Sequence, residues 1–263
     1  MAFSFIKKGA ESEKLAKQEE AASEARKEEM GKMWRFFLKK GETAAITFVD
    51  GALNEKGLFV PTRFYEHDWP IQNRPHYFVC PEQTNPEGGD KCPICATGKY
   101  PYLAAVFTII DHRQFTSTKQ GSEGKVFKDR PRLLVAKPKT VEMLTLEAQK
   151  RGGLEGCLFD VYRSTDQTAA AVGSTFSFTS KTPVAQLKGK WFEETKDPKT
   201  NVVTKVDCFQ VANYEEEITY RTGDELRKLG YWTNGPVANL NPGGNVPPQT
   251  PSTEAEEDYE KHL

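Results

Sequence analysis

Apolar residues between positions 43 and 211 gather in short runs that are separated by turn signals. The runs that predict strands are 43–49, 58–65, 76–79, 103–110, 126–127, 132–135, 158–162, 175–178 and 206–211. Short runs bounded by Gly, Pro, Asn, Asp and Ser are typical of β-strands. Residues 141–151, which end at Gly152 and Gly153, predict one internal helix, and residues 224–230 predict a shorter one. The pattern therefore predicts a mainly β fold, either a small barrel or a sandwich.

The two ends of the chain follow different patterns. Residues 10–33 are rich in Ala, Glu and Lys, which are strong helix formers, but they offer too few apolar positions for a core-facing stripe. We expect residues 1–33 to form a polar helical arm, either solvated or docked on a neighbouring molecule. Residues 234–252 contain Asn-Gly-Pro, Asn-Pro-Gly-Gly and Pro-Pro, which predict a flexible linker before a disordered acidic tail at 254–263. We therefore expect residues 34–233 to form the folded core.

Charge and composition narrow the class of protein. The chain has 263 residues and a net charge of −1, but residues 31–233 carry 29 basic and 25 acidic side chains, while residues 234–263 carry one Lys and five acidic side chains. A mildly basic body with an acidic tail is a pattern of proteins that bind polyanions. No window approaches about 18 apolar residues, so we expect no membrane span. Five Cys suit a reducing compartment, so we expect a cytoplasmic protein rather than a disulfide scaffold.

The strongest chemical signal is a group of three cysteines. Cys92-Pro-Ile-Cys95 is a usual half of a structural zinc site, and Cys80 supplies a third thiolate across a loop rich in Gly and Pro. The spacing therefore predicts one zinc ion, held within a small subdomain at about residues 64–100. A closed tetrahedral site also needs a fourth ligand.

Two histidines compete for the fourth position. His76 lies four residues before Cys80, which is about 13 Å along one strand and too far for both to hold one ion unless the strand bends. His67 lies thirteen residues before Cys80, and the turn-rich stretch 70–75 can reverse the chain between them. An antiparallel hairpin would then place His67 opposite Cys80, with Cβ atoms about 5 Å apart. His67 is therefore the favoured ligand and His76 the alternative.

The sequence favours a structural metal over a catalytic one. Zinc deaminases carry His-x-Glu with Pro-Cys-x-x-Cys, whereas here His67 is followed by Asp68 and Trp69. The chain contains no His-Glu-x-x-His motif and no phosphate-binding Gly-x-x-x-x-Gly-Lys-Ser/Thr loop. With four protein ligands the site would be closed, so we expect no enzymatic activity. The two remaining cysteines lie in strand-like apolar runs and are expected to be buried core thiols: Cys157 and Cys208.

The predicted core repeatedly places aromatic residues beside Lys or Arg. On an open barrel face, flat rings can stack on unpaired bases while cations meet phosphates, with little sequence preference. The residues that we single out for DNA binding on this ground are Arg63, Tyr65, Arg74, Tyr77, Tyr100, Tyr102, Arg113, Phe115, Lys125, Phe127 and Lys128. The alternative is that alternating strands direct the rings into the core and the cations to solvent.

These residues together resemble a known family. The spacing His67…Cys80…Cys92-x-x-Cys95, the apolar strand that follows, and the run Glu123-Gly-Lys-Val-Phe-Lys128 are similar to those of the zinc-containing single-stranded-DNA-binding (helix-destabilising) protein of T-even-type bacteriophages. The resemblance covers roughly residues 34–180 and the layout of both ends. The metal spacing and the Glu-Gly-Lys-Val-Phe-Lys run are fairly specific in combination.

The resemblance implies an OB-fold core with a zinc subdomain, zinc at those four residues, and cleft roles near Tyr102, Lys125 and Lys128. It also implies that a basic N-terminal segment supports self-association along DNA and that the acidic tail recruits replication or recombination proteins. Two features depart from the family. The N-terminal basic motif is reduced to Lys7-Lys8 followed by Gly-Ala, and the stretch after the last predicted zinc ligand is shorter.

These observations predict a non-catalytic protein that coats and protects single-stranded DNA during phage DNA replication, recombination or repair. Base stacking and phosphate contacts would make the binding tolerant of sequence. The alternative is a zinc-ribbon transcription factor or an RNA-binding factor.

Overall fold

The computed structural model describes residues 9, 13, 17, 32–71, 74–116, 124, 126–166, 168–196 and 203–230. They fall into two compact units. The sheet unit comprises Met33–Phe64 and Tyr102–Tyr214. The cysteine unit comprises Tyr65–Pro101 and the described part of Glu215–Pro251. The linker and tail expected at 234–263, and the arm expected at 1–33 apart from a few residues, lie outside the described residues.

The sheet unit is built on antiparallel strands in the order β7 (Arg130–Ala136), β4 (Tyr102–Asp111), β1 (Thr43–Phe48), β8 (Cys157–Tyr162) and β9 (Thr175–Lys181). The mainly β prediction is therefore confirmed. The expected OB-type barrel is not confirmed: the sheet is not closed, because β7 and β9 do not pair with each other in the part of the chain that the structure describes. The periodicity of single strands reports which face is buried, but it does not report whether the two outer strands meet.

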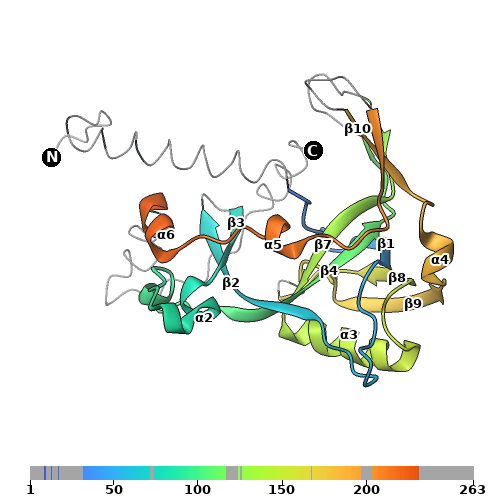
Figure 1. Cartoon of the computed structure of the whole chain (residues 1–263), viewed down its shortest axis with the longest axis horizontal. Helices are drawn as coiled ribbons and strands as arrows, with labels where there is room; N and C mark the ends of the chain where they lie inside the picture. Colours follow the sequence, from blue (N-terminus) through green and yellow to red (C-terminus); the bar gives the residue numbers. More distant parts are fainter. Residues whose placement is uncertain are drawn as a thin grey trace. The chain divides into compact units, whose positions relative to one another are not determined.

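The core of the sheet unit lies between the sheet and α3 (Pro138–Arg151) (Figure 1). Val141, Leu144 and Ala148 form the buried stripe of α3. The helix begins three residues before the predicted start, because Pro138 occupies its first turn, where the missing N–H has no partner to lose. It ends at Gly152, whose φ of 66° is the left-handed conformation that glycine adopts without strain.

Several short elements complete the sheet unit. Residues 34–36 run beside β7, where the Phe36 N–H donates to the Leu133 carbonyl and the Leu133 N–H donates to the Trp34 carbonyl, at 2.8 and 2.9 Å. The remaining elements are β5 (Phe115–Thr116) with β6 (Val126–Phe127), α4 (Val184–Leu187), and the hairpin of β10 (Phe192–Lys196) and β11 (Val203–Asp207). Figure 1 shows this hairpin projecting away from β8 and β9.

The cysteine unit is small and is built from short elements. It contains most of β2 (Thr62–Ile71), β3 (Arg74–Val79), α2 (Pro81–Thr84), the 3₁₀ turns η1 (Pro86–Gly88) and η2 (Cys95–Thr97), most of α5 (Tyr214–Glu217), and α6 (Gly223–Leu229). The predicted strand at 58–65 corresponds to β2, which starts later and extends further. The predicted subdomain ended near residue 100, whereas in the structure α6 also belongs to this unit. No helix among the described residues is long and apolar enough to cross a membrane.

Candidate metal centre

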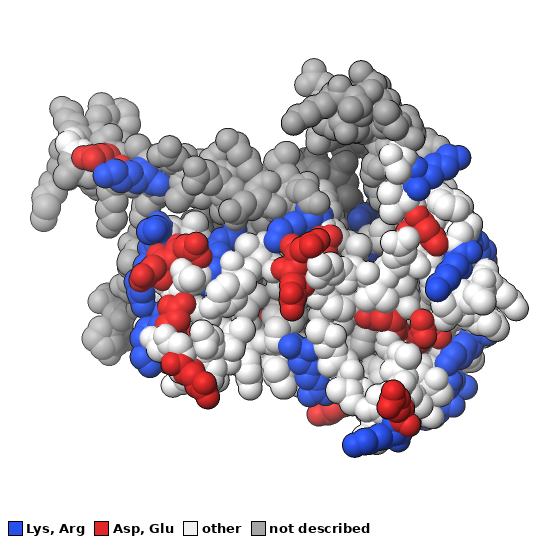
Figure 2. Space-filling model, in the orientation of Figure 1, with Lys and Arg blue, Asp and Glu red and all other residues white. Residues whose placement is uncertain are grey.

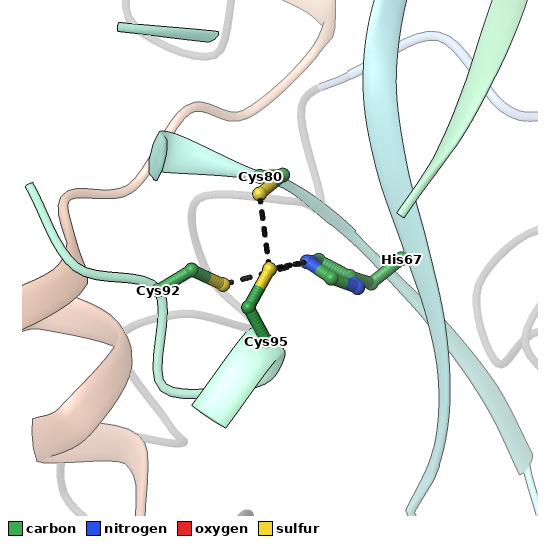
Figure 3. Close-up of side chains that lie close together, drawn as sticks. All are labelled: His67, Cys80, Cys92 and Cys95. Atoms are coloured by element: carbon green, nitrogen blue, oxygen red, sulfur yellow. Dashed lines mark hydrogen bonds between the residues drawn. The ribbon is translucent and has the colours of Figure 1, made fainter. Parts of the chain in front are cut away.

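Four side chains of the cysteine unit converge on one point (Figure 3). The donor atoms of His67, Cys80, Cys92 and Cys95 all lie within 4.8 Å of one another. Cys95 Sγ is 3.7 Å from Cys80 Sγ, and His67 Nε2 is 3.4 Å from Cys92 Sγ and 3.6 Å from Cys95 Sγ. This cluster could hold a metal ion, and it consists of the four ligands that the sequence predicted.

The β2–β3 hairpin supplies the first two donors. His67 is directly opposite Phe78, while the Cys80 N–H donates to the Tyr65 carbonyl at 2.8 Å. His67 and Cys80 are therefore diagonal neighbours rather than the directly opposite pair that we expected. A displacement of two residues keeps both side chains on the same face, because the side-chain period of a strand is two. The alternative ligand His76 is opposite Trp69 and its ring stacks on Phe78, outside the cluster.

A tight turn supplies the other two donors. The Ala96 N–H donates to the Cys92 carbonyl at 3.2 Å, and the Gly98 N–H donates to the Cys95 carbonyl at 2.9 Å. Gly98 has a φ of 85°, so this turn requires a residue that tolerates the left-handed region. The Cys92 N–H donates to the Glu82 carboxylate at 3.1 Å, which ties the turn to α2. That bond is the main reason why the pKa of Glu82 lies below its usual value.

The spacing of the donors fits a tetrahedral zinc ion. With zinc–sulfur bonds of about 2.3 Å and a zinc–nitrogen bond of about 2.0 Å, tetrahedral geometry separates two sulfurs by about 3.8 Å and sulfur from nitrogen by about 3.5 Å. Three of the six donor separations are close to these values, at 3.7 Å between Cys80 and Cys95 and at 3.4 and 3.6 Å from His67 to Cys92 and Cys95, and all six are within 4.8 Å. Three thiolates and one imidazole are also a donor set that structural zinc sites use.

Burial sets the protonation states in this cluster. Desolvation, followed by the positive charge of Lys99, lowers the pKa of His67 to about 4, so the imidazole is neutral at neutral pH and free to ligate. Desolvation also raises the pKa of Cys92 and of Cys95, since a buried thiolate without a cation is costly. His67 Nδ1 is buried and has no hydrogen-bond partner among the described residues. Neutral imidazole beside buried sulfur suits a site in which a divalent cation supplies the missing charge.

The DNA-binding candidates of the cysteine unit and of β2 have different environments. Tyr65 packs against the apolar cluster that surrounds the cysteines, and Tyr77 is half-buried. Arg63 is exposed, and the Tyr100 side chain is 79% exposed. The side chain of Arg74 lies outside the described residues.

The candidates of the sheet unit lie at the two ends of β4: Tyr102 begins the strand, whereas Arg113 and Phe115 follow its end. Arg113 lies over the rings of Phe36 and Phe115, at 5.1 Å from each ring centre, and its guanidinium donates to Asp111 and Glu42. Lys137 Nζ lies 4.5 Å from the centre of the Tyr102 ring. Lys128 is exposed, and Lys125 lies outside the described residues.

The sequence analysis missed three residues that lie around the candidates Phe115 and Phe127, namely Trp34, Arg130 and Arg132. The Arg132 guanidinium lies 5.7 Å from the ring centres of both Trp34 and Phe115, and Arg130 lies 4.9 Å from that of Phe127. We call Trp34, Phe115, Phe127, Arg130 and Arg132 the aromatic–arginine cluster, and each of its members is half-buried. Arg130-Pro-Arg132 follows the singled-out Phe127 and Lys128 after one residue, Asp129, and this proximity in sequence is the signal that could have found the two arginines.

Two polar networks of the sheet unit contain titratable side chains. The His112 ring bridges Thr47 Oγ1 at 2.8 Å and Asp129 Oδ1 at 2.6 Å. The same order of hydroxyl, imidazole and carboxylate is found in hydrolytic triads. Thr47 is only 4% exposed and lies between β4 and β8, so its hydroxyl is shielded from any substrate. In the second network Tyr214 donates to the Asp50 carboxylate, and burial raises the pKa of Asp50 to about 6.

Comparisons with protein-family models, with curated proteins and with solved structures gave no significant match to this chain.

Proposed function

We propose that this protein binds single-stranded DNA with little sequence preference and coats exposed strands during phage DNA replication, recombination or repair. The observation that carries the proposal is the aromatic–arginine cluster, in which half-buried rings alternate with guanidinium groups. Rings of this kind stack on unpaired bases, and arginines contact phosphates and stack on bases as well. Duplex DNA offers no unstacked bases, so the cluster favours single strands.

The neighbouring charges support a defined contact surface rather than a broad basic face. Arg113 is held by Asp111 and Glu42, so its charge is already paired while its guanidinium supports the Phe115 ring. Arg130 lies 4.9 Å from the centre of the Phe127 ring, and Arg132 lies 5.7 Å from that of Phe115. On the face drawn in Figure 2, basic and acidic side chains are interspersed in small groups. The proposal therefore depends on the cluster and not on net charge.

The metal centre has a structural role in this proposal. Zinc bound by three thiolates and one imidazole supplies folding free energy to the cysteine unit, and no ligand position is left open for a substrate. We also propose that the sheet unit is related to the OB-fold and that the cysteine unit corresponds to its zinc subdomain, as the resemblance implies. The acidic tail would recruit replication or recombination proteins, the N-terminal arm would support self-association, and the protein would act in the cytoplasm of the host cell.

Tryptophan fluorescence of the full chain tests this function. We expect poly(dT) to quench the signal strongly, duplex DNA to quench it weakly, and the logarithm of the affinity to fall linearly with the logarithm of the salt concentration. Trp34→Phe should remove most of the quenching. The matched control Trp191→Phe should not, because Trp191 packs on His112 and Phe209 and belongs to a different apolar cluster of the sheet unit. Preferential binding of poly(U) would favour the RNA-binding alternative, and equal binding of duplex DNA would reject the proposal.

A further inference from the structure

Helix α6 packs on the metal centre although it lies far away in the sequence. Leu226 and Leu229 of α6 are 1% and 6% exposed and belong to the same apolar cluster as Cys80 and Cys92. Of the described segments of the cysteine unit, α6 is the one that arrives last along the chain, after all of the sheet unit. The metal centre is therefore assembled from two segments that are separated by more than a hundred residues.

Polar contacts fix α6 to the residues that precede Cys92. The Gly223 N–H donates to both carboxylate oxygens of Asp90, at 3.0 and 2.8 Å. Arg227 Nη2 donates to the Lys91 carbonyl at 2.8 Å. The Cys92 N–H is held by Glu82, as described above. The backbone that carries the Cys92 ligand is thus held by α2 on one side and by α6 on the other.

Gly223 permits this close approach. A Cβ atom at this position would lie 2.3 Å from the Lys91 carbonyl oxygen and 2.5 Å from Asp90 Oδ1. Real Cβ contacts are not this short, so any larger residue would push α6 away from the ligand loop. The Thr222 side chain starts the helix at the same point through a capping box with Glu225. The first turn of α6 is therefore built against the ligand loop and does not merely lie near it.

We propose that α6 is a positioning element of the metal centre, and that docking of α6 and binding of the metal stabilise each other. This inference rests on the proposed metal centre. Groups that hold ligands in place typically change metal affinity by about 10–100-fold when they are altered. Coupling between two binding events is reciprocal, so the metal must favour the docked helix by the same factor. Loss of the metal would then release residues 222–230, from which the acidic C-terminal segment continues.

Gly223→Ala in the full chain tests the first half of the coupling. We expect its zinc affinity, measured by competition with a chromogenic chelator, to fall about 10–100-fold. Bound Co²⁺ should give a weaker or shifted ligand-to-metal charge-transfer band. Lys228→Ala is the matched control on α6, because its side chain is exposed, and it should bind zinc normally. Leu144→Ala, in the core of the sheet unit, should lower the melting temperature without changing the metal affinity, which separates positioning from general destabilisation.

Hydrogen exchange of the unmodified chain tests the second half. Chelation should remove protection from the amides of 222–230 together with those of 80–98, and zinc should restore both. If Gly223→Ala fails to fold, Arg227→Ala removes one contact and should change the zinc affinity in the same direction. Unchanged zinc affinity in the α6 variant tested, or unchanged protection of α6 after chelation, would overturn the coupling. Failure of the metal centre itself would look different, because the unmodified chain would then bind neither Zn²⁺ nor Co²⁺.

Discussion

The sheet unit and the cysteine unit are stabilised in different ways. Among the described residues, the main core of the sheet unit contains eighteen buried residues, and its rings meet edge to face, as Phe48 and Phe159 do at 5.6 Å. The cluster of the cysteine unit contains seven, and two of those are the metal-ligand candidates Cys80 and Cys92. A core that small seldom outweighs the entropy of an ordered chain. We therefore expect burial to stabilise the sheet unit, and we propose that the cysteine unit depends on a bound metal ion.

Removal of the metal should have the largest effect and should separate the two units. We expect a chelator to abolish hydrogen-exchange protection around Phe78 and Ile94, because metal-binding free energy is also folding free energy there. Protection around Phe107 and Phe159 should persist, since these residues belong to the apolar core of the sheet unit.

Two cysteine variants give the same test without a chelator. Cys92→Ser should reproduce the effect of chelation, because it removes a ligand. Cys208→Ala should retain the metal, since this buried thiol belongs to the sheet unit and is not a ligand. Simultaneous unfolding of both units on loss of the metal would show that the comparison is wrong.

A cavity in the core of the sheet unit should have the next largest effect. Leu144 on α3 is 0% exposed, so Leu144→Ala should lower the free energy of unfolding by about 2–5 kcal/mol in urea titrations. Leu146→Ala on the same helix is the matched control, because Leu146 is 57% exposed and should cost little. Retained zinc content in both variants is expected. A loss of metal from Leu144→Ala would show that the metal centre depends on the core of the sheet unit.

The buried carboxyl of Asp50 should make the stability of the sheet unit depend on pH. Burial raises its pKa from 3.8 to about 6, so between these values the folded state holds a proton that the unfolded state releases. The free energy of unfolding should therefore fall as pH rises through this window, by about 3 kcal/mol in total, and should level off above it. The unmodified chain should show this decrease with pH, whereas Asp50→Asn should not. The control Asp160→Asn, which alters an exposed carboxylate, should show the same decrease as the unmodified chain. Identical slopes in the unmodified chain and Asp50→Asn would mean that Asp50 is ionised throughout.

The four members of the candidate metal centre could be predicted from the sequence, because the convergence of such ligands depends on local spacing. The Cys-x-x-Cys turn and the hairpin before it bring donors together with few long-range requirements. The predicted hairpin register was wrong by two residues, yet the ligand choice survived, since a shift of two keeps His67 and Cys80 on one face. The open sheet could not be predicted, because strand order is set by packing between distant strands and not by alternation within one.

Contacts between distant segments were the other part that could not be predicted. The bond between Gly223 and Asp90 joins residues 133 positions apart, and the capping box at Thr222 signals a helix start but not its neighbour. Trp34 begins the folded core predicted at 34–233, but no strand was predicted before residue 43, whereas residues 34–36 run beside β7. That pairing depends on the edge of β7, which lies about a hundred residues further along the chain, so no local pattern predicts it.

The affinity for DNA should depend on the sheet unit more than on the cysteine unit. Phe115→Ala should weaken binding to poly(dT) by about 1–3 kcal/mol, because it removes a stacking ring between two guanidinium groups. Tyr100→Ala removes a ring of the cysteine unit that is 79% exposed, and it should leave the affinity nearly unchanged if binding is confined to the sheet unit. Melting temperature and zinc content serve as controls for folding. A larger loss of affinity in Tyr100→Ala would extend the DNA contact to the cysteine unit.

The smallest effect is expected from Lys128, an exposed cation that directly follows Phe127 of the aromatic–arginine cluster. Lys128 has no ring to stack, so Lys128→Ala should reduce the dependence of log affinity on log salt by about 0.7, the value for one lost phosphate contact on a single strand. The affinity should change little at high salt, where released counterions contribute less. Lys56→Ala is the matched control, because Lys56 is equally exposed in the sheet unit but lies in a turn outside the cluster. Equal changes of slope in both variants would mean that the sheet unit attracts DNA through general charge rather than at the cluster.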